Sequence, residues 1–356
     1  DGKKFNKTYE VLFPHSLGLF YTAVTQFLGF NKYGDEYKVM GLAPYGKPLF
    51  YDKMKEIIYK KKKQKFRLNL DYFIHHKEGV EMTWLNSEPN IGRVYSNKFN
   101  ELLGDERKKN DVITIRHKNI ASSAQKIYED IFFEIINDLN KNNKSENLCI
   151  SGGCAMNSVA NGKIKLNTSY KKIYIPPAPG DSGGAIGAAS LVINNNSQNT
   201  TFKDNPYLGP KYNNNEIFDV INKFKKQLKD FKIEIKKFEK KEDLLILLAK
   251  KISENKIIGF FNERMEWGPR ALGNRSILAN PTEKNMREII NQKIKRRESF
   301  RPFAPSILRE YVNDWFEQDE DVPFMSQVLQ VKPNKRSLIP AVTHVDGSGR
   351  LQTVDN

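Results

Sequence analysis

The chain has 356 residues, of which 39% are hydrophobic, and it carries a formal net charge of +16. This length allows two packed domains, because single cores rarely grow much beyond about 250 residues. No apolar run reaches the roughly 18 residues of a membrane-spanning helix, so no membrane partner is expected. The basic excess follows a general bias toward Lys and Asn, without the interleaved aromatic residues of a base-stacking surface, so nucleic acid is not favoured as a partner.

The first half of the chain alternates helices and strands. An amphipathic helix is predicted within 16–29, and a long helix over 119–140 follows from apolar residues spaced four apart. Residues 50–115 are rich in Lys and weakly periodic, which predicts an inserted region. Short buried strands are predicted at 147–150 and 172–176, each followed by a glycine-containing turn and a helix. This alternation is typical of an α/β domain.

The second half begins after a polar stretch, 194–206, which is predicted to be a linker. Helices are predicted near 215–228, 241–254 and 282–293, and strands at 231–235, 256–261, 323–331 and 343–345. The strand at 256–261 is expected to be buried and to lead directly into an arginine-rich loop.

The two cysteines, Cys149 and Cys154, match no zinc-binding spacing. One lies in an apolar run and the other follows a pair of glycines, so both are predicted to be small, reduced core residues. A cytoplasmic location is expected. The adjacent pair His75 and His76 has no ligand partner at helical spacing, so it is predicted to lie at the surface.

The arginine-rich loop, 262–276, places Arg264, Arg270 and Arg275 among glycine and proline residues. Such a backbone can approach a ligand closely, and arginine binds phosphate or carboxylate with two parallel hydrogen bonds. The segment 294–305 adds four more cations: Lys295, Arg296, Arg297 and Arg301. The pattern predicts a pocket for small, multiply charged anions. The alternative is a solvated basic face, which the neighbouring Trp267, Phe300 and Phe303 disfavour.

Other candidate contacts are weaker. Gly152 and Gly153 follow a strand and precede a helix, which suits either a nucleotide phosphate or close helix–strand packing, and Asn157 is one turn further on. Asp181 begins a helix of small residues, as a cap or as a metal-site or phosphate-site carboxylate. Arg350 follows two glycines and His344, in a stretch that forms either a turn or part of the anion pocket.

Several of these motifs carry a family resemblance: His15–Gly18, Glu36–Gly46, Ser151–Asn157, Pro179–Gly184, Gly268–Ser276, Arg297–Pro305 and Thr343–Gly347. Together they resemble the NodU/CmcH family of carbamoyltransferases, in consistent order along nearly the whole chain. Residues 50–115 match poorly. The resemblance implies the C-terminal portion of an actin/sugar-kinase-like (ASKHA, RNase H-like) domain over 1–200, followed over 206–356 by part of a YrdC-like α/β domain.

In such enzymes the YrdC-like module condenses carbamoyl phosphate with ATP to carbamoyladenylate, and the other module passes the carbamoyl group to an acceptor hydroxyl of a sugar or secondary metabolite. By resemblance, Arg270, Lys295, Arg301 and Arg350 are the catalytic residues that hold carbamoyl phosphate and ATP, together with Arg275 and Ser276. Lys38, Gly152, Gly153 and Asn157 would line the nucleotide site of the transfer module, and Asp181 would bind its iron-type metal (Fe²⁺ or similar). Mg²⁺ is expected with ATP.

The chain departs from the family pattern at both ends. The His-rich metal motif of the first half of the ASKHA domain is not in it, nor are the later YrdC-like residues, so we expect an interior piece of a longer protein. A threonylcarbamoyl-type tRNA-modifying enzyme and a non-catalytic ASKHA nucleotide-binding regulator are the alternative functions. The acceptor and the oligomeric state stay open at this point.

Overall fold

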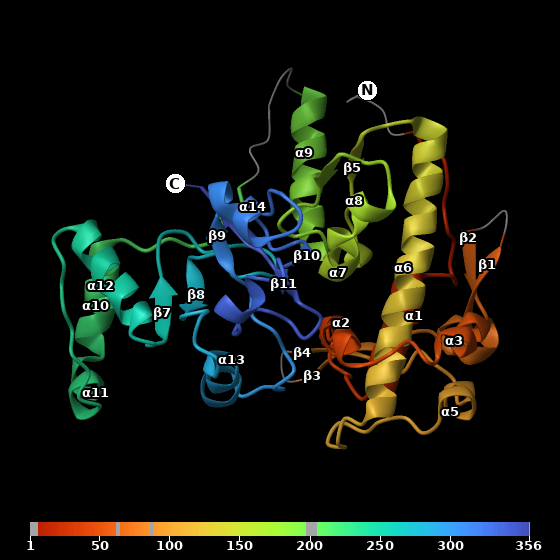
Figure 1. Ribbon diagram of the computed structural model, residues 1–356, viewed down its shortest axis with the longest axis horizontal. Coiled ribbons are helices and arrows are strands. Elements are labelled where there is room, and N and C mark those ends of the chain that lie inside the picture. The colour runs from red at the N-terminus through yellow and green to blue at the C-terminus, as the bar shows by residue number, and fades with distance from the viewer. Residues whose placement is uncertain (1–5, 62–64, 86–87, 197–204, 356) are drawn as a thin grey trace.

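The computed structural model describes residues 6–61, 65–85, 88–196 and 205–355. Residues 6–196 form the N-terminal part, and residues 205–355 form the C-terminal part beside it (Figure 1). Short strands pair two by two in both parts, and helices pack around them. This mixed content agrees with the predicted α/β class.

The N-terminal part contains both long and very short helices. In chain order they are α1 (Leu17–Phe27), α2 (Glu36–Leu42), α3 (Tyr51–Ile57), α4 (His75–Glu78), α5 (Lys98–Leu103), α6 (Ile115–Asn143), α7 (Ser158–Gly162), α8 (Ile164–Asn167) and α9 (Gly184–Asn196). Its 3-10 turns include η1 (Ala43–Tyr45), η3 (Gly153–Met156) and η4 (Asp181–Gly183). Its strands form two antiparallel pairs, β1 (Ile58–Lys61) with β2 (Lys65–Leu68) and β3 (Met82–Leu85) with β4 (Glu88–Ile91), and one parallel pair, β5 (Asn147–Cys149) with β6 (Lys172–Tyr174).

Helix α6 runs the length of the N-terminal part and packs against α1, α2 and α3 (Figure 1). It confirms the helix predicted over 119–140 and extends it at both ends, and at the N-terminus a capping box satisfies its first N–H groups. Ile127 and Ile131 are buried on the face that meets the core, whereas Leu139 is 38% exposed. Four-residue spacing therefore marks the buried face only where the helix has packing partners.

The segment 50–115, predicted to be an insertion, contributes directly to the core of the N-terminal part. It supplies α3 to α5 and β1 to β4, and its buried side chains belong to the same cluster as those of α1 and α6: Met54, Ile57, Ile58, Phe66, Leu68, Phe73, Val94, Tyr95, Phe99 and Leu103. The surface position predicted for His75 is wrong, because this side chain is 1% exposed and its Nε2 lies 2.9 Å from the carbonyl oxygen of Pro14. His76 is partly exposed.

Strands β5 and β6 confirm the strands predicted at 147–150 and 172–176, in shorter form. Only Leu148 of β5 is buried, and the core position predicted for Cys149 is wrong because this residue is exposed. Cys154 is partly buried against the core. Among the described residues β6 is the one strand that pairs with β5, so the other edge of β5 has no partner strand there.

In the C-terminal part the helices are α10 (Asn214–Lys223), α11 (Lys225–Asp230), α12 (Lys241–Ser253), α13 (Met286–Ile289), which continues as a π-helical turn (Ile290–Ile294), and α14 (Val312–Trp315). The strands pair as β7 (Ile258–Phe261) with β8 (Arg275–Leu278), antiparallel; β9 (Ser306–Leu308) with β12 (Gln352–Val354), parallel; and β10 (Val328–Gln330) with β11 (Ser348–Arg350), antiparallel. The predicted linker 194–206 lies mostly outside the described residues, and its first residues belong to α9.

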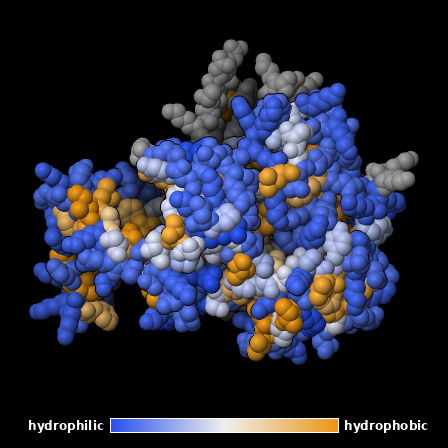
Figure 2. All heavy atoms as spheres, in the orientation of Figure 1, coloured by the Kyte–Doolittle hydropathy of each residue, from blue (hydrophilic) through white to orange (hydrophobic). Residues whose placement is uncertain are grey.

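Helices α10, α11 and α12 form an arm at one end of the molecule, and no side chain in them is buried (Figure 1). Figure 2 shows apolar side chains at this end, where Phe218 is 61% and Ile246 is 68% exposed. The strand predicted at 231–235 is wrong: these residues form a turn and an extended stretch without a ladder, because no described strand pairs with them. Strand β7 is present as predicted but only half-buried, and its Phe261 is 60% exposed.

Two small cores lie in the rest of the C-terminal part. One gathers Val312, Phe316, Leu329 and Leu351, and the other gathers Met286, Ile290 and Ala341. The strand predicted at 343–345 is wrong, because a turn from His344 to Gly347 precedes the observed strand β11. Nowhere in the described parts of the chain is there a helix with the length and apolar character needed to cross a membrane.

Candidate anion-binding site

The loop 262–276 is organised by a buried carboxylate of its own. Glu266 is 6% exposed. Its Oε1 accepts hydrogen bonds from the backbone N–H groups of Leu272 (2.7 Å), Asn274 (2.7 Å) and Arg275 (3.2 Å). Burial alone would raise the pKa of Glu266, but the backbone hydrogen bonds outweigh it and the pKa falls below its ordinary value. An ionised side chain therefore holds the loop in shape.

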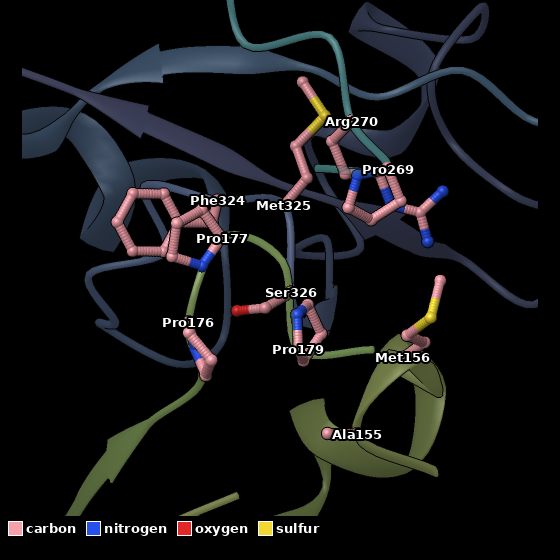
Figure 3. Close-up of a pocket in the computed structure, with 10 residues that line it drawn as sticks. All are labelled: Ala155, Met156, Pro176, Pro177, Pro179, Pro269, Arg270, Phe324, Met325 and Ser326. Carbon is pink, nitrogen blue, oxygen red and sulfur yellow. The ribbon is translucent and has the colours of Figure 1, made fainter. Parts of the chain in front are cut away.

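Gly268 brings this loop against the turn that follows β6. Its φ is +110°, which favours glycine, and a Cβ there would lie 2.7 Å from the carbonyl oxygen of Pro177. A small, partly open pocket lies at this contact, between the two parts of the molecule. Its lining residues are Ala155, Met156, Pro176, Pro177, Pro179, Pro269, Arg270, Phe324, Met325 and Ser326 (Figure 3). In Figure 3 the Arg270 guanidinium points away from Pro176 and Pro177, toward the side where Met156 lies.

Four guanidinium groups come together next to this pocket, and we call them the arginine cluster: Arg270, Arg297, Arg301 and Arg350. Burial lowers the pKa of Arg350 well below its ordinary value, and the charges of the other three lower it further. Burial and then Arg301 likewise lower the pKa of Arg270, and lower that of Arg297 to about 10. Like charges kept from water repel each other, so this arrangement favours an anion among them.

Arg350 gives the most direct indication of a ligand. It lies in β11, opposite Val328 of β10, and its Nε is buried without a hydrogen-bond partner among the described residues. A buried donor without an acceptor costs about 1–3 kcal/mol, and more when the group is charged. An anion with several oxygen atoms would both accept from this N–H and reduce the repulsion within the arginine cluster.

Aromatic rings fix the planes of two guanidinium groups. Arg297 lies over the ring of Phe303 at 4.8 Å, and its Nε donates to Oδ1 of Asn291 at 2.7 Å. Arg301 lies over the ring of Tyr37 at 4.5 Å. Because Tyr37 belongs to α2, one side of the arginine cluster is built by the N-terminal part.

A carboxylate, Glu298, lies at the edge of the arginine cluster. Its Oε2 is 3.6 Å from Nη1 of Arg301, and its Oε1 is 3.2 Å from Nζ of Lys38. Burial would raise the pKa of Glu298, but a backbone hydrogen bond, Lys38 and Arg301 lower it overall. Lys38, predicted to contact a nucleotide, pairs with Asp35 (3.0 Å) and Glu298, and the nucleotide contact stays a prediction. Burial opposes its charge, and the two carboxylates raise its pKa above the ordinary value.

The other residues predicted for the anion pocket lie in different surroundings. The Arg275 guanidinium donates to backbone carbonyl oxygens of Asn262, Asn274, Pro210 and Glu263, and stacks on Phe261 at 3.5 Å. Ser276 accepts a hydrogen bond from the backbone N–H of Gly273 at 3.0 Å. Both therefore shape the loop. The Lys295 side chain is exposed at the end of the π-helical turn, where its backbone N–H donates to Ile290.

The residues predicted for a nucleotide site in the N-terminal part form a separate group. Gly152 and Gly153 are exposed, with open space where a Cβ would lie. Asn157 is buried, caps α7 and exchanges two hydrogen bonds with Gln125 (3.0 and 3.1 Å). The Gly–Gly turn is thus accessible to a ligand, whereas the Asn157 side chain is already committed to the fold.

Asp181, the predicted metal ligand, is exposed at the start of η4, and its Oδ2 accepts a hydrogen bond from the Tyr33 hydroxyl at 3.1 Å. Among the described residues no group of three or more His, Cys, Asp or Glu side chains gathers as a metal site. These residues therefore do not supply a ligand set for Fe²⁺, and a metal at Asp181 stays a prediction.

His344 is half-buried near Arg350, with its Nε2 withdrawn from water, and its Nδ1 lies 3.1 Å from the Ser348 hydroxyl. Burial lowers its pKa to about 4, with a further contribution from Arg350, while Asp346 opposes the shift. The imidazole is therefore neutral near pH 7, and it adds no charge to the surroundings of Arg350.

Tyr37, Glu266 and Glu298 were not among the residues predicted for the site. An acid inside an arginine-rich segment is a usable signal for an internal counter-ion, and both glutamates have it. Tyr37 offers no such signal, since its role depends on Arg301, which is distant in the chain. Arg297 was grouped with the cations of the anion pocket, but no role was predicted for it.

Comparisons with protein families account for most of the chain. The family model described as the carbamoyltransferase N-terminus matches residues 1–190, and that described as the carbamoyltransferase C-terminus matches residues 249–356. The match to the second model includes all four members of the arginine cluster.

Individual relatives agree with these matches. An uncharacterised protein of Synechocystis is 38% identical over 99% of this chain and 59% of its own length. Nodulation protein NolNO of Sinorhizobium fredii is 34% identical over 96% of the chain and 47% of its own length, and nodulation protein NolO of Bradyrhizobium diazoefficiens is 34% identical over 97% and 59%. The chain thus spans between 47% and 59% of the length of these relatives. It belongs to the carbamoyltransferase family.

Proposed function

We propose that the protein activates carbamoyl phosphate with ATP at the arginine cluster and then transfers the carbamoyl group to the hydroxyl of a small-molecule acceptor. The observation that carries the proposal is the half-buried Arg350, whose buried Nε has no hydrogen-bond partner among the described residues and whose charge faces three further guanidinium groups. Such a site suits the clustered negative charges of acyl phosphates and nucleotides. Membership of the carbamoyltransferase family indicates that the transferred group is a carbamoyl group.

The activation step consumes carbamoyl phosphate, ATP and water, and releases carbamoyladenylate, pyrophosphate and phosphate. In the second step the acceptor oxygen attacks the carbamoyl carbon, AMP leaves, and the hydroxyl proton is lost. Arg270, Arg301 and Arg350 would bind the phosphate oxygens and neutralise the charge that develops on them, which is how proteins chiefly accelerate phosphoryl-type reactions. Lys295 would join them by moving its exposed side chain toward the bound phosphates.

We assign the two steps, activation and transfer, to different parts of the molecule. All four members of the arginine cluster lie in the C-terminal part, which we assign to a YrdC-like activating domain over 206–356. The N-terminal part, assigned to an ASKHA-type transfer domain over 1–200, offers the accessible Gly152–Gly153 turn to the nucleotide end of carbamoyladenylate. Mg²⁺ is expected to accompany ATP. A tRNA-modifying enzyme and a non-catalytic regulator, the alternatives considered above, gain no support from the family matches.

The test measures pyrophosphate release by the intact protein, with ATP and carbamoyl phosphate present together and singly. We expect release only with both substrates, and an Arg350→Met variant should lose at least about a hundredfold in kcat/KM, as when a charge-stabilising donor is removed from an active site. Arg309→Met is the matched control, because Arg309 pairs with Asp319 away from the arginine cluster. Full activity of Arg350→Met would show that the arginine cluster is not the site of activation.

A further inference from the structure

Lys38, Glu298 and Arg301 form a chain of charges across the boundary between the two parts. Lys38 belongs to α2, whereas Glu298 and Arg301 belong to the loop after the π-helical turn. The Lys38 and Glu298 side chains are 13% and 32% exposed, so both are partly withdrawn from water. The chain therefore connects a helix of the N-terminal part with one guanidinium of the arginine cluster.

The loop that carries Glu298 and Arg301 is fastened to the N-terminal part next to Lys38. The Phe300 ring lies 6.4 Å from the ring of Phe30 and packs against the N-terminal core, and the Tyr45 hydroxyl donates to the Phe300 carbonyl oxygen at 3.4 Å. The Lys38 ammonium lies over that same Phe30 ring at 5.4 Å. Lys38 thus faces a fixed loop. In this loop the Glu298 carboxylate lies between two cations, Lys38 and Arg301.

Glu298 competes with any anion that binds at Arg301. It is the carboxylate, among the described residues, whose charge acts on both Arg297 and Arg301. Its 3.6 Å separation from Arg301 exceeds the roughly 2.7–2.9 Å of a charge-assisted hydrogen bond, so the pair is loose. Its separation from Lys38 is shorter, at 3.2 Å. Without the Lys38 charge, Glu298 would close on Arg301 and occupy the position of an incoming phosphate oxygen.

We propose that Lys38 is a positioning residue for anion binding: it holds the Glu298 carboxylate toward α2 and so leaves Arg301 available to phosphate. The inference rests on the proposed function of the arginine cluster. It gives the N-terminal part a role in the activation step, exerted through Glu298 rather than by contact with the reacting groups. A direct nucleotide contact by Lys38 is the competing explanation.

A double-mutant cycle on the intact protein separates the two explanations. The variants are Lys38→Met, Glu298→Gln and their combination, with Lys55→Met as the control, because Lys55 pairs with Asp52 on the exposed surface of α3. Binding of inorganic pyrophosphate is measured by titration calorimetry. The KM for carbamoyl phosphate and kcat are measured from pyrophosphate release, and thermal unfolding shows that each variant is folded.

We expect Lys38→Met to weaken pyrophosphate binding and raise the KM for carbamoyl phosphate by about three- to tenfold, the range of coupling between contacting charges, with kcat near that of the wild type. Lys38→Arg should restore both values. Glu298→Gln should bind pyrophosphate at least as tightly as the wild type, and adding Lys38→Met to it should have no further effect. Lys55→Met should match the wild type.

Two results overturn the inference: an equal loss from Lys38→Met with and without Glu298→Gln, which indicates direct contact, or no loss in either background. If Lys38→Met does not fold, Glu298→Gln alone decides, and weaker pyrophosphate binding by this variant contradicts the competition. Failure of the proposed function looks different, because the wild type would then bind no pyrophosphate or Arg350→Met would bind it equally well.

Discussion

The guanidinium carbon of Arg301 lies 4.5 Å from the centre of the Tyr37 ring, so a residue of α2 supports a residue of the arginine cluster across the boundary between the two parts. The ring fixes the plane in which Arg301 presents its N–H groups. Phe300 and Tyr45 hold the same boundary a short distance away. The arginine cluster is therefore completed by the N-terminal part.

Removing the Tyr37 ring should loosen Arg301. We expect Tyr37→Leu to raise the KM for carbamoyl phosphate about fivefold, which corresponds to a cation–π contact of about 1 kcal/mol. Tyr37→Phe keeps the ring and should stay close to the wild type. Steady-state kinetics of pyrophosphate release measure the effect, and equal KM values for the leucine and phenylalanine variants would show that the stack does not position Arg301.

Glu266 should be required for the shape of the 262–276 loop. Its carboxylate accepts backbone N–H groups of this loop and is buried, so Glu266→Ala leaves those donors unpaired and should lower the free energy of unfolding by about 2–4 kcal/mol. Glu266→Gln keeps one oxygen acceptor and should lose less. Urea unfolding measures both, with the exposed Glu239→Ala as the control. An alanine variant as stable as that control would contradict the assigned role.

Gly268 and Gly273 offer a matched pair for the contact between the loop and Pro177. Both have positive φ (+110° and +120°), so replacement by alanine strains the backbone at either position, by about 1–3 kcal/mol. Only at Gly268 would the new Cβ also meet the Pro177 carbonyl oxygen, since open space surrounds Gly273. Gly268→Ala should therefore lose more stability and more pyrophosphate-forming activity than Gly273→Ala. Equal losses would show that the close approach does not matter.

The half-buried His344 should make the protein sensitive to acid. Burial lowers its pKa from the ordinary 6.5 to about 4, so the unfolded chain takes up a proton between these values while the folded protein does not. The stabilisation is therefore complete above pH 6.5 and falls with pH down to about 4, by up to about 3 kcal/mol.

The His344 contribution is isolated by comparing the wild type with His344→Gln, which cannot titrate. Urea unfolding at pH 7 and at pH 4.5 should show a larger loss of stability for the wild type than for the variant. The same pH dependence in both proteins would mean that other groups account for the acid sensitivity.

Local patterns in the sequence predicted those elements whose formation depends on nearby residues rather than on a distant partner. Helix α6 was predictable because the apolar spacing that marks its buried face lies within the helix itself. The strand expected at 231–235 shows the limit, since alternation of apolar residues does not tell whether a partner strand is present. His75 illustrates the same point, because its burial depends on Phe13, Pro14 and Phe73 rather than on its own neighbours at helical spacing.

The residues of the candidate site were likewise predictable only where a local motif marks them. Arg270, Arg301 and Arg350, which were expected to share one ligand, do lie together. Sequence motifs revealed them, because Arg270 and Arg350 follow glycine residues and Arg301 precedes Pro302. The side chains that support them were not predictable. Tyr37 and Lys38 reach the arginine cluster only through the packing of α2 against a distant loop, and Arg275 donates its hydrogen bonds to the backbone.

In the proposed function, the arginine cluster serves an activation in which ATP is converted to carbamoyladenylate and pyrophosphate. The most direct test is to incubate the intact protein with ATP, Mg²⁺ and ¹³C-labelled carbamoyl phosphate, without an acceptor, and to identify the nucleotide products by mass spectrometry. We expect labelled carbamoyladenylate with pyrophosphate, both lost in Arg350→Met. ADP as the product, or pyrophosphate release that does not depend on carbamoyl phosphate, would contradict it.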